Sequence, residues 1–197
     1  MNLELNKLLS QERGLFFEFQ MNSHAENKSV FEDTQLFEVV EFNIEEGLSS
    51  PYIISLLLVS REDNLTAEQF IDQAGVLSIF RNYNLERYFH GIVFSFTKGN
   101  SGSRHTFYKL ELVPELSRLS LRYNSRIFQA MTVEEIAQKI FKEMHIEEYQ
   151  FHLKHRLEAR EFCVQYAESD LHFLERIFAE EGIFYYFQHS DTLHTLM

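Results

Sequence analysis

The stretch Arg160-Glu161-Phe162-Cys163-Val164-Gln165-Tyr166-Ala167-Glu168-Ser169-Asp170-Leu171 reads as a short strand that leads directly into a helix. We expect the strand over Phe162–Tyr166. Ser169 is suited to cap the helix N-terminus, and Asp170 lies in the first turn, where a negative charge is favourable. The helix is expected to end at Gly182, because glycine readily adopts the left-handed conformation of a C′ residue. Its buried stripe is expected to consist of Phe173, Leu174, Ile177 and Phe178.

The rest of the second half of the chain predicts a mixture of helix and strand. A capping box of Thr132 and Glu135 indicates a further helix. Short strands are expected over Tyr149–Leu153 and, after the last helix, over Ile183–Phe187. The segment Leu116–Phe128 mixes Leu and Arg at irregular spacing, so its secondary structure stays open.

The first half of the chain predicts a β-meander with one short helix. The helix is expected to start at Thr66, which forms a T-x-x-Q capping box with Gln69, and to end near Gly75. The Gly- and Ser-rich residues 98–103 are typical of a hairpin tip, and the polar residues 22–35 of a loop. Strands are expected over residues 15–21, 36–44, 51–59, 76–81, 88–97 and 105–113.

The composition indicates a folded protein in which strands predominate. Hydrophobic residues make up 45% of the 197 residues, with 20 Phe and 9 Tyr but no Trp. Aromatic and β-branched residues favour strands, and the 7 Gly and 2 Pro argue against long flexible linkers. We therefore expect a β-rich α+β fold.

The charge of the chain disfavours nucleic acid as a partner. The formal net charge is -12, from 30 acidic and 18 basic residues, and an acidic surface repels a phosphate backbone. The nearest approach to a basic cluster is Arg118, Arg122 and Arg126. These residues could line a solvated face or hold a phosphate, and the sequence favours the solvated face.

No residue pattern points to an enzyme, a cofactor or a metal. The nine histidines include two close pairs, but the H-E-x-x-H pattern is absent and no pair of cysteines supports a zinc site, so exposed or locally bonded side chains are expected. The pairs are His152 with His155 and His189 with His194. His90 is expected to be buried and hydrogen-bonded. No serine lies in a nucleophile elbow and no nucleotide fingerprint occurs, so we expect no catalytic residue.

The cysteine content and the termini bear on the compartment. Cys163 is the only cysteine, which excludes an internal disulfide, and its apolar neighbours predict a small buried hydrophobe. The N-terminus lacks the apolar run of a signal peptide, and no segment approaches the about 20 apolar residues of a spanning helix. If this protein leaves the cell, we expect a route that does not read an N-terminal signal. The stop at Met197, soon after a predicted strand, suggests a truncated chain.

Several motifs, taken in order, resemble those of the VgrG family, the spike proteins of bacterial type VI secretion. The stretch quoted above is the most specific of them, and the resemblance covers roughly residues 15 to 196. The other motifs are Leu48-Ser49-Ser50-Pro51-Tyr52, Arg87-Tyr88-Phe89-His90-Gly91-Ile92-Val93, Leu112-Val113-Pro114-Glu115-Leu116, Ser125-Arg126-Ile127-Phe128-Gln129 and Glu180-Glu181-Gly182-Ile183-Phe184-Tyr185-Tyr186-Phe187-Gln188-His189. The residues that carry the resemblance are Phe89, His90, Gly91, Pro114, Ser125, Arg126, Phe128, Arg160, Glu161, Cys163, Gln165, Tyr166, Glu168, Ser169, Asp170, Glu181 and Gly182. We expect structural rather than catalytic roles for all of them.

The resemblance implies the fold and the partners of a contractile spike. VgrG proteins are similar to the hub of phage tails, which implies a barrel-type β-domain plus a smaller mixed α/β region. The implied partners are two further copies in a homotrimer, an Hcp-like hexameric tube and baseplate proteins. A PAAR-type tip protein and effectors would bind through later segments. The resemblance also implies a protein that resides in the cytoplasm before firing and that type VI secretion then releases or delivers into a target cell.

On this basis we expect three parts in the chain. These are an N-terminal extension at 1–14, a β-rich hub barrel domain with one short helix at 15–113, and a mixed α+β hub domain at 114–197. The extension and Ala167, where many relatives carry a charged residue, depart from the family pattern. Two alternatives stay open: a hub of a phage tail or another contractile injection system, and a small β-rich hydrolase or ligand-binding domain.

Overall fold

The computed structural model describes residues 14–22 and 36–197, which form two compact units. Most of the expected N-terminal extension and of the expected polar loop lies outside the described residues. The first unit contains the described residues up to Glu45, together with Ile53–Val113 and His189–His194. The second contains Glu46–Tyr52, Pro114–Gln188 and Thr195–Met197. The division expected between residues 113 and 114 stays a prediction, since each unit draws residues from both sides of that point.

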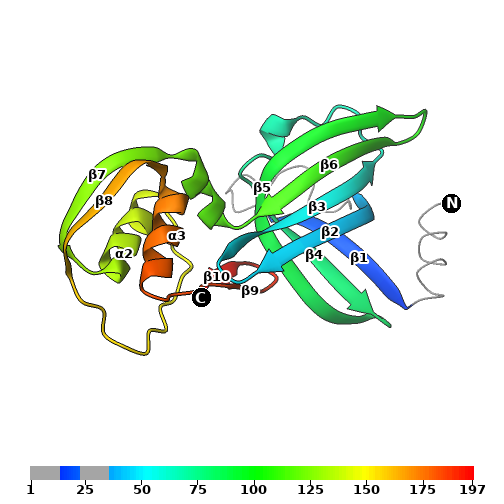
Figure 1. The fold of residues 1–197 in the computed structure, drawn as a ribbon. Helices are drawn as coiled ribbons and strands as arrows, with labels where there is room; N and C mark the ends of the chain where they lie inside the picture. The colour runs from blue at the N-terminus through cyan, green and yellow to red at the C-terminus, as the bar shows by residue number, and fades with distance from the viewer. Residues whose placement is uncertain (1–13, 23–35) are drawn as a thin grey trace. The chain divides into compact units, whose positions relative to one another are not determined.

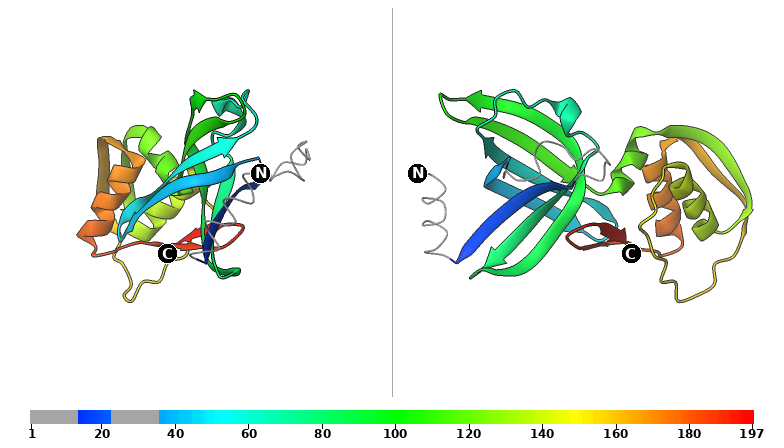
Figure 2. Two further views of the ribbon diagram at one scale, coloured as in Figure 1. Left: turned by 90° about the vertical axis from the view of Figure 1, so that its right-hand side faces the viewer. Right: turned by 180° about the vertical axis from the view of Figure 1, so that it is seen from behind.

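The first unit is built on a curled six-stranded sheet, as the expected barrel-type domain requires (Figure 1). Within the described residues the strand order is β1-β4-β5-β6-β3-β2, with β1 and β2 at the two edges. The view from behind shows the same curvature (Figure 2). The strands are β1 (Leu15–Asn22), β2 (Glu38–Gly47), β3 (Ser50–Ser60), β4 (Ala74–Arg81), β5 (Asn84–Ser101) and β6 (Thr106–Val113).

Aromatic rings fill the core of the first unit. Phe37 is 1% exposed, and its ring centroid lies 5.5 Å from that of Phe70, 5.9 Å from that of Tyr108 and 6.2 Å from that of Phe96. Edge-to-face contacts of this kind stabilise beyond the burial of apolar area. The high Phe content of the sequence therefore serves the core of this sheet.

The helix expected from Thr66 to Gly75 is shorter than predicted. Only one 3-10 turn forms, η1 (Ala67–Gln69), because the backbone turns at Asp72, where φ is 65°, and β4 then begins. The local capping signal was real: the Gln69 side chain accepts the backbone N–H of Thr66 at 2.9 Å. A capping box predicts where a helix starts but not how far it runs.

Both helices expected in the second unit form. α2 (Val133–Glu143) is capped by Thr132, whose hydroxyl accepts the N–H of Glu135, and the Glu135 carboxylate accepts the N–H of Thr132 at 2.8 Å. α3 (Asp170–Glu180) follows Ser169, which accepts the N–H of His172. Gly182 lies beyond its end with φ 68°, the expected C′ conformation.

These helices pack on one face of a two-stranded sheet formed by β7 (Tyr123–Met131) and β8 (Arg160–Ser169) (Figure 1). Phe128 of β7 stacks on Phe173 of α3 with ring centroids 5.5 Å apart. Cys163 is buried in the same core, as expected. The segment left open by the sequence consists of the 3-10 helix η2 (Glu115–Leu121) and the start of β7.

Two short strands differ from expectation. Tyr149–Leu153 makes only an isolated bridge between Tyr149 and Leu196, and Ile183–Tyr186 belongs to no strand. The ladder forms later, between β9 (Phe187–His189) and β10 (His194–Leu196). The aromatic residues of 183–187 predicted an extended backbone, but they do not show with which strand it pairs. Among the described residues, no helix combines the length and the apolar character needed to cross a membrane.

The close approach of β5 and β6 explains why a glycine is needed at position 91, one of the residues that carry the resemblance. A Cβ atom added at Gly91 would lie 2.9 Å from the carbonyl oxygen of Val113, which is nearer than a real side chain comes. We expect Gly91→Ala to lower the free energy of unfolding by about 1–3 kcal/mol, because backbone must move to admit the methyl group.

The matched control is Gly47→Ala, since a Cβ there meets nothing within 4 Å. Urea denaturation of both variants measures the effect. Equal midpoints for the two variants would show that the strand spacing adjusts at no cost.

Candidate functional site: signature networks and an exposed sheet face

Asp170 is the centre of the polar residues that carry the family resemblance. Its side chain is 0% exposed. Oδ1 accepts hydrogen bonds from Gln165 at 2.8 Å, from Asn124 at 3.1 Å and from Arg126 at 3.1 Å. Oδ2 accepts from Arg122 Nε. The buried carboxylate is thus paired with two guanidinium groups and held by two amides.

A second carboxylate completes this network. Oε2 of Glu143, at the end of α2, accepts from Arg122 at 2.8 Å and from Arg126 at 2.8 Å. Arg126 also donates through Nε to Gln165 at 2.9 Å. Two arginines therefore face two carboxylates, so the cluster as a whole is neutral and links α2, α3, β7 and β8.

Hydrogen bonding and charge decide the ionisation of this network. Burial alone would raise the pKa of Asp170, but the hydrogen bonds from Gln165, Asn124 and Arg122 and the charge of Arg126 outweigh it and hold the pKa below its usual value. Burial likewise opposes ionisation of Glu143, and its two arginine partners lower its pKa. Both carboxylates are thus charged at neutral pH.

Sequence reasoning missed how Arg122, Asn124 and Glu143 take part. For Arg122 and Arg126 the sequence left a solvated face and a phosphate site as alternatives. In the structure, both arginines instead bind a buried aspartate. One signal was available: Arg122, Asn124, Arg126 and Phe128 recur at period two. That spacing places their side chains on one face of a strand. Arg118 is not part of the network; it lies 3.7 Å from Glu115.

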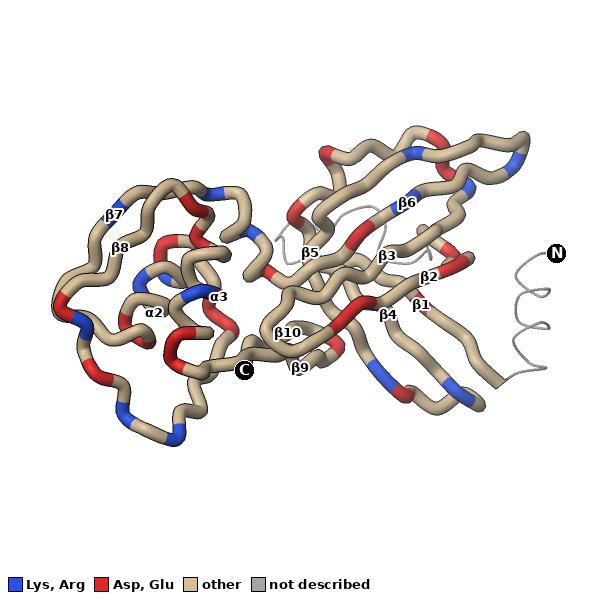
Figure 3. The backbone as a smooth tube through the Cα atoms, viewed as in Figure 1, with Lys and Arg blue, Asp and Glu red and all other residues tan. Residues whose placement is uncertain are grey.

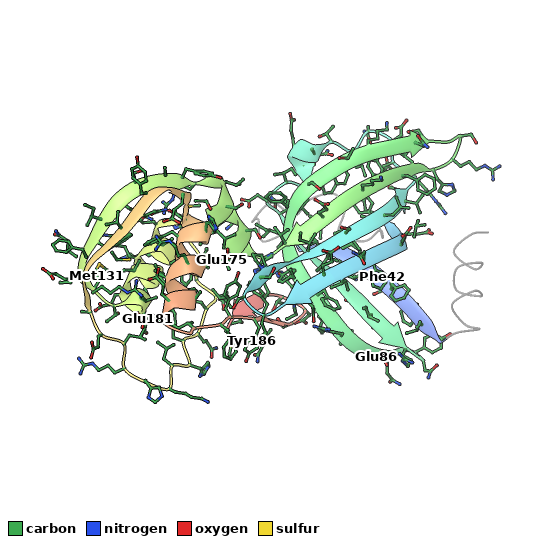
Figure 4. The ribbon with its side chains drawn as sticks, viewed as in Figure 1. Phe42, Glu86, Met131, Glu175, Glu181 and Tyr186 are labelled. Atoms are coloured by element: carbon green, nitrogen blue, oxygen red, sulfur yellow. The ribbon has the colours of Figure 1, made fainter. Side chains whose placement is uncertain are left out.

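Further ion pairs connect the end of α3 to β8. Arg160 bonds Glu181 and Glu180, each at 2.6 Å, and its pKa is raised because these carboxylates outweigh the effect of burial. Arg176 bonds Glu168 at 2.6 Å and Glu180 at 3.1 Å. On α3, Glu175 accepts the hydroxyl of Tyr185 at 2.8 Å, and Figure 4 marks Glu175 and Glu181.

The residues that carry the family resemblance are called signature residues. Most of those that remain in the second unit shape the backbone. Pro114 caps η2, and its carbonyl accepts the N–H of Ser117 at 2.9 Å. The hydroxyl of Ser125 accepts the N–H of Ala167 at 3.1 Å, where β8 has a φ of 48°. Glu161 and Tyr166 are exposed on β8.

Phe89, His90 and Gly91 belong to β5, in the first unit. Phe89 is buried, and the guanidinium carbon of Arg87 lies 4.2 Å from its ring centroid. The residues that carry the resemblance are therefore divided between the two units.

The histidines follow the expectation only in part. His90 is buried and hydrogen-bonded, as predicted, and exposed His152 bonds locally to Gln150. His194 was expected to be exposed or locally bonded, but it is buried and bonds His90, which lies 104 residues away. In the part of the chain that the structure describes, no group of three or more His, Cys, Asp or Glu residues could hold a metal.

The β7–β8 sheet exposes an apolar face, and α2 and α3 cover its other face (Figure 1). Ile127 and Val164 are directly paired across the strands. On β8 the bulky apolar residues point outward, whereas Cys163 and Gln165 point inward. This outer face consists of Tyr123 (71% exposed), Ile127 (62%), Phe162 (58%), Val164 (48%) and Tyr166 (79%).

The second unit combines ion-paired side chains with an exposed apolar face. Charged side chains that carry the resemblance, such as Asp170 and Arg160, form ion pairs within the unit. Acidic and basic residues are interspersed over the second unit (Figure 3). Large exposed apolar patches mark interaction surfaces in soluble proteins. The chemistry of the second unit therefore consists of fold-stabilising ion pairs behind an outward apolar face.

Because Asp170 is the centre of the buried network, we expect its replacement by asparagine to lower the free energy of unfolding strongly. Asp170→Asn leaves Arg122 and Arg126 without a full countercharge, so we expect the unfolding free energy to fall by about 3–5 kcal/mol at neutral pH. The folded-state pKa of Asp170 is lowered, so its contribution is present above the unfolded pKa of about 3.9 and is lost as the pH falls through the folded pKa. The difference between wild type and variant should therefore shrink in acid.

Chemical denaturation across a pH series measures this, with Glu86→Gln as the control. Glu86 pairs with Arg81 at the surface, with 41% of its side chain exposed, and an exposed pair contributes about 1 kcal/mol or less. An Asp170→Asn variant that is no less stable than Glu86→Gln would contradict the central role of the carboxylate.

Comparison with known proteins connects these features to a family. The profile described as "Phage tail baseplate hub (GPD)" matches residues 45–197. The chain is 54% identical over 139 residues to actin cross-linking toxin VgrG1 of Vibrio cholerae, which covers 71% of this chain and 13% of that protein. It is 54% identical over 140 residues to the type VI secretion system spike protein VgrG3 of the same species, covering 71% and 14%. The chain thus spans only a small part of the length of these relatives.

The fold is shared with a solved structure. The Escherichia coli protein c3393, a component of the type VI secretion system that is structurally similar to T4 tail proteins gp27 and gp5, superimposes with a TM-score of 0.77. Its sequence identity is 24%, covering 91% of this chain and 48% of that protein. The phage tail hub-like fold and the resemblance to VgrG proteins are both confirmed, and the chain belongs to the phage tail baseplate hub family.

Proposed function

We propose that this chain is the structural hub at the base of a type VI secretion spike. The observation that carries the proposal is how β7 and β8 distribute their residues. Their polar signature residues stabilise the fold, and their apolar residues face outward. A part that works by assembly needs both properties, whereas an enzyme needs polar groups free to meet a substrate.

The sequence identities favour a type VI spike over the other contractile hubs. The family description names a phage tail baseplate, so the fold alone fits either particle. The identity of 54% to a type VI spike protein extends over 71% of the chain and supports the narrower assignment. A hub of a phage tail or another injection system is the alternative.

We propose no enzymatic activity for this part of the protein. The likeness to VgrG1, named as an actin cross-linking toxin, extends over only 13% of that protein. The ion pairs of Asp170, Arg160 and Arg176 support a structural reading of the residues that carry the resemblance.

The proposed assembly is a homotrimer that docks on an Hcp-like hexameric tube and on baseplate proteins. A PAAR-type tip protein and effectors would be carried through parts of the full-length protein beyond those described here. The protein would reside in the cytoplasm before firing and would then be released or delivered into a target cell.

The outer face of β7–β8 is where we expect contact between copies. Replacing Ile127 and Val164 together by Thr keeps β-branched residues on the strands but makes the face more polar. We expect this double variant to self-associate about tenfold more weakly than wild type. Light scattering coupled to size-exclusion chromatography over a concentration series measures the difference.

Val40→Thr is the control, since Val40 is 50% exposed on β2, in the first unit. Association that is unchanged in the double variant, or weakened equally by Val40→Thr, would contradict the assignment of this face. A monodisperse monomer of wild type at all concentrations would contradict self-assembly altogether.

Release from the cell tests the secretion role directly. We expect the full-length protein to appear in the medium of cells with an intact contractile apparatus and to stay inside when the sheath is disabled. Immunoblots of cell and medium fractions, with a cytoplasmic enzyme as the lysis marker, measure this. Equal release from both strains would refute the spike assignment.

A further inference from the structure

Three histidines that are distant in sequence meet in the first unit. His90 lies on β5, His189 ends β9 and His194 begins β10. His90 is 5% exposed and His194 is 6% exposed. Strands β9 and β10 form a hairpin, and residues 189–194 are its tip. The hydrogen bonds that join His189 and His194 to His90 span 99 and 104 residues. The hairpin tip is thus attached to β5 through histidine side chains.

The first contact requires an unprotonated ring nitrogen. The backbone N–H of His90 donates to Nδ1 of His189 at 3.2 Å. A ring nitrogen accepts a hydrogen bond only while it carries no proton. A second proton on the ring of His189 would turn this acceptor into a donor that faces another donor, and the contact would be lost.

The second contact is a bond between two rings. Nδ1 of His90 and Nδ1 of His194 lie 3.0 Å apart, so one nitrogen carries the proton and the other accepts it. If both rings became imidazolium, two donors and two like charges would face each other in a buried place. Desolvation penalises each of these charges, so this contact fails once both rings are protonated.

The residues beside His90 on the neighbouring strands are apolar. Val76 of β4 pairs with His90, and Val113 of β6 pairs with the nearby Ile92. The charged residues on the surrounding elements are Arg81 on β4, Glu86, Arg87 and Lys98 on β5, Lys109 and Glu111 on β6, Asp72 before β4 and Asp191 in the hairpin turn.

Glu111 is engaged by a neighbouring side chain, and the charges of Asp191 and Arg87 act on protonated histidines in opposite directions. Glu111 accepts a hydrogen bond from Ser95 at 2.8 Å. Asp191 is exposed, so water and salt screen its attraction for an imidazolium. The guanidinium of Arg87 lies over the ring of Phe89, which in turn lies 5.4 Å from the ring of His189, and its positive charge disfavours a further cation.

The hairpin tip holds its own shape. The N–H of Ser190 donates to the carbonyl of Leu193 at 2.9 Å. The hydroxyl of Ser190 accepts from the N–H groups of Thr192 and Leu193 at 3.3 and 3.1 Å. Because these bonds lie within the turn, the tip can leave β5 as one piece.

We propose that His90, His189 and His194 form a proton-operated latch, which holds residues 189–194 on β5 at neutral pH and releases them in mild acid. Histidine ordinarily titrates near pH 6.5, so the change falls in a range that cellular compartments and media reach. The latch is independent of the proposed secretion role.

Hydrogen exchange of the whole 197-residue chain tests the latch. Exchange would be measured by mass spectrometry at about pH 7.5 and about pH 5.5, with the rates corrected for the intrinsic effect of pH. We expect peptides covering residues 189–194 to exchange at least about tenfold faster in acid, because two hydrogen bonds are lost. Unchanged corrected rates would overturn the proposal.

Two variants assign the effect to the latch. His194→Gln cannot take up a proton, so we expect much weaker pH dependence in the tip. His152→Gln, at an exposed and locally bonded histidine, should keep the wild-type pH dependence. A wild-type response in His194→Gln, or a lost response in His152→Gln, would overturn the assignment.

A measurement on the wild type avoids any folding defect of the variants. Long-range ¹H–¹⁵N spectra of the histidine rings should show an unprotonated Nδ1 on His189 at neutral pH. A protonated Nδ1 on His189 would refute the latch. Binding of one zinc ion per chain with slowed exchange at the tip would also refute it, because the ring pair would then serve as a metal site.

Discussion

A carboxylate with no exposed surface must find all its hydrogen-bond and charge partners inside the fold. The second unit must therefore fold so that its strands and helices bring these partners to Asp170. Arg126 reaches it only if β7 pairs with β8 so that Arg126 lies opposite Gln165. Arg122 reaches it from the segment before β7, and Glu143 neutralises the second guanidinium from the end of α2. Strand register, helix start and helix packing are therefore coupled through one side chain, whose energetic weight comes from desolvation.

The same requirement accounts for the apolar outer face of β7–β8. Gln165 points inward because it donates to Asp170, and alternation along a strand then directs Val164 and Tyr166 outward. An ordinary surface strand would bury its largest apolar residues and expose its amide. Fold stability and an apolar surface for assembly thus follow from one choice of strand orientation, and under the proposed function both are needed in the same place.

Local signals predicted much of the fold, whereas contacts between distant residues did not follow from the sequence. The capping residues Thr132 and Ser169 marked the starts of α2 and α3, because a cap acts within one turn. The helix expected after Thr66 stopped after one turn, since its length depends on the sheet that follows. The pair of His90 and His194 and the arginines around Asp170 join residues far apart in the chain, and no local pattern encodes such partners. The resemblance identified the signature residues without showing that Asp170 organises them.

Each compact unit is assembled from segments that are separated in the gene. Residues 46–52 and 195–197 belong with 114–188, and residues 189–194 belong with the curled sheet. A recombination event that joins two related genes at any single point between residues 53 and 188 would combine, in at least one unit, segments from different parents. Exchange among such genes should therefore succeed mainly where both parents share residues such as His90 and His194, or where the crossover falls beyond Met197.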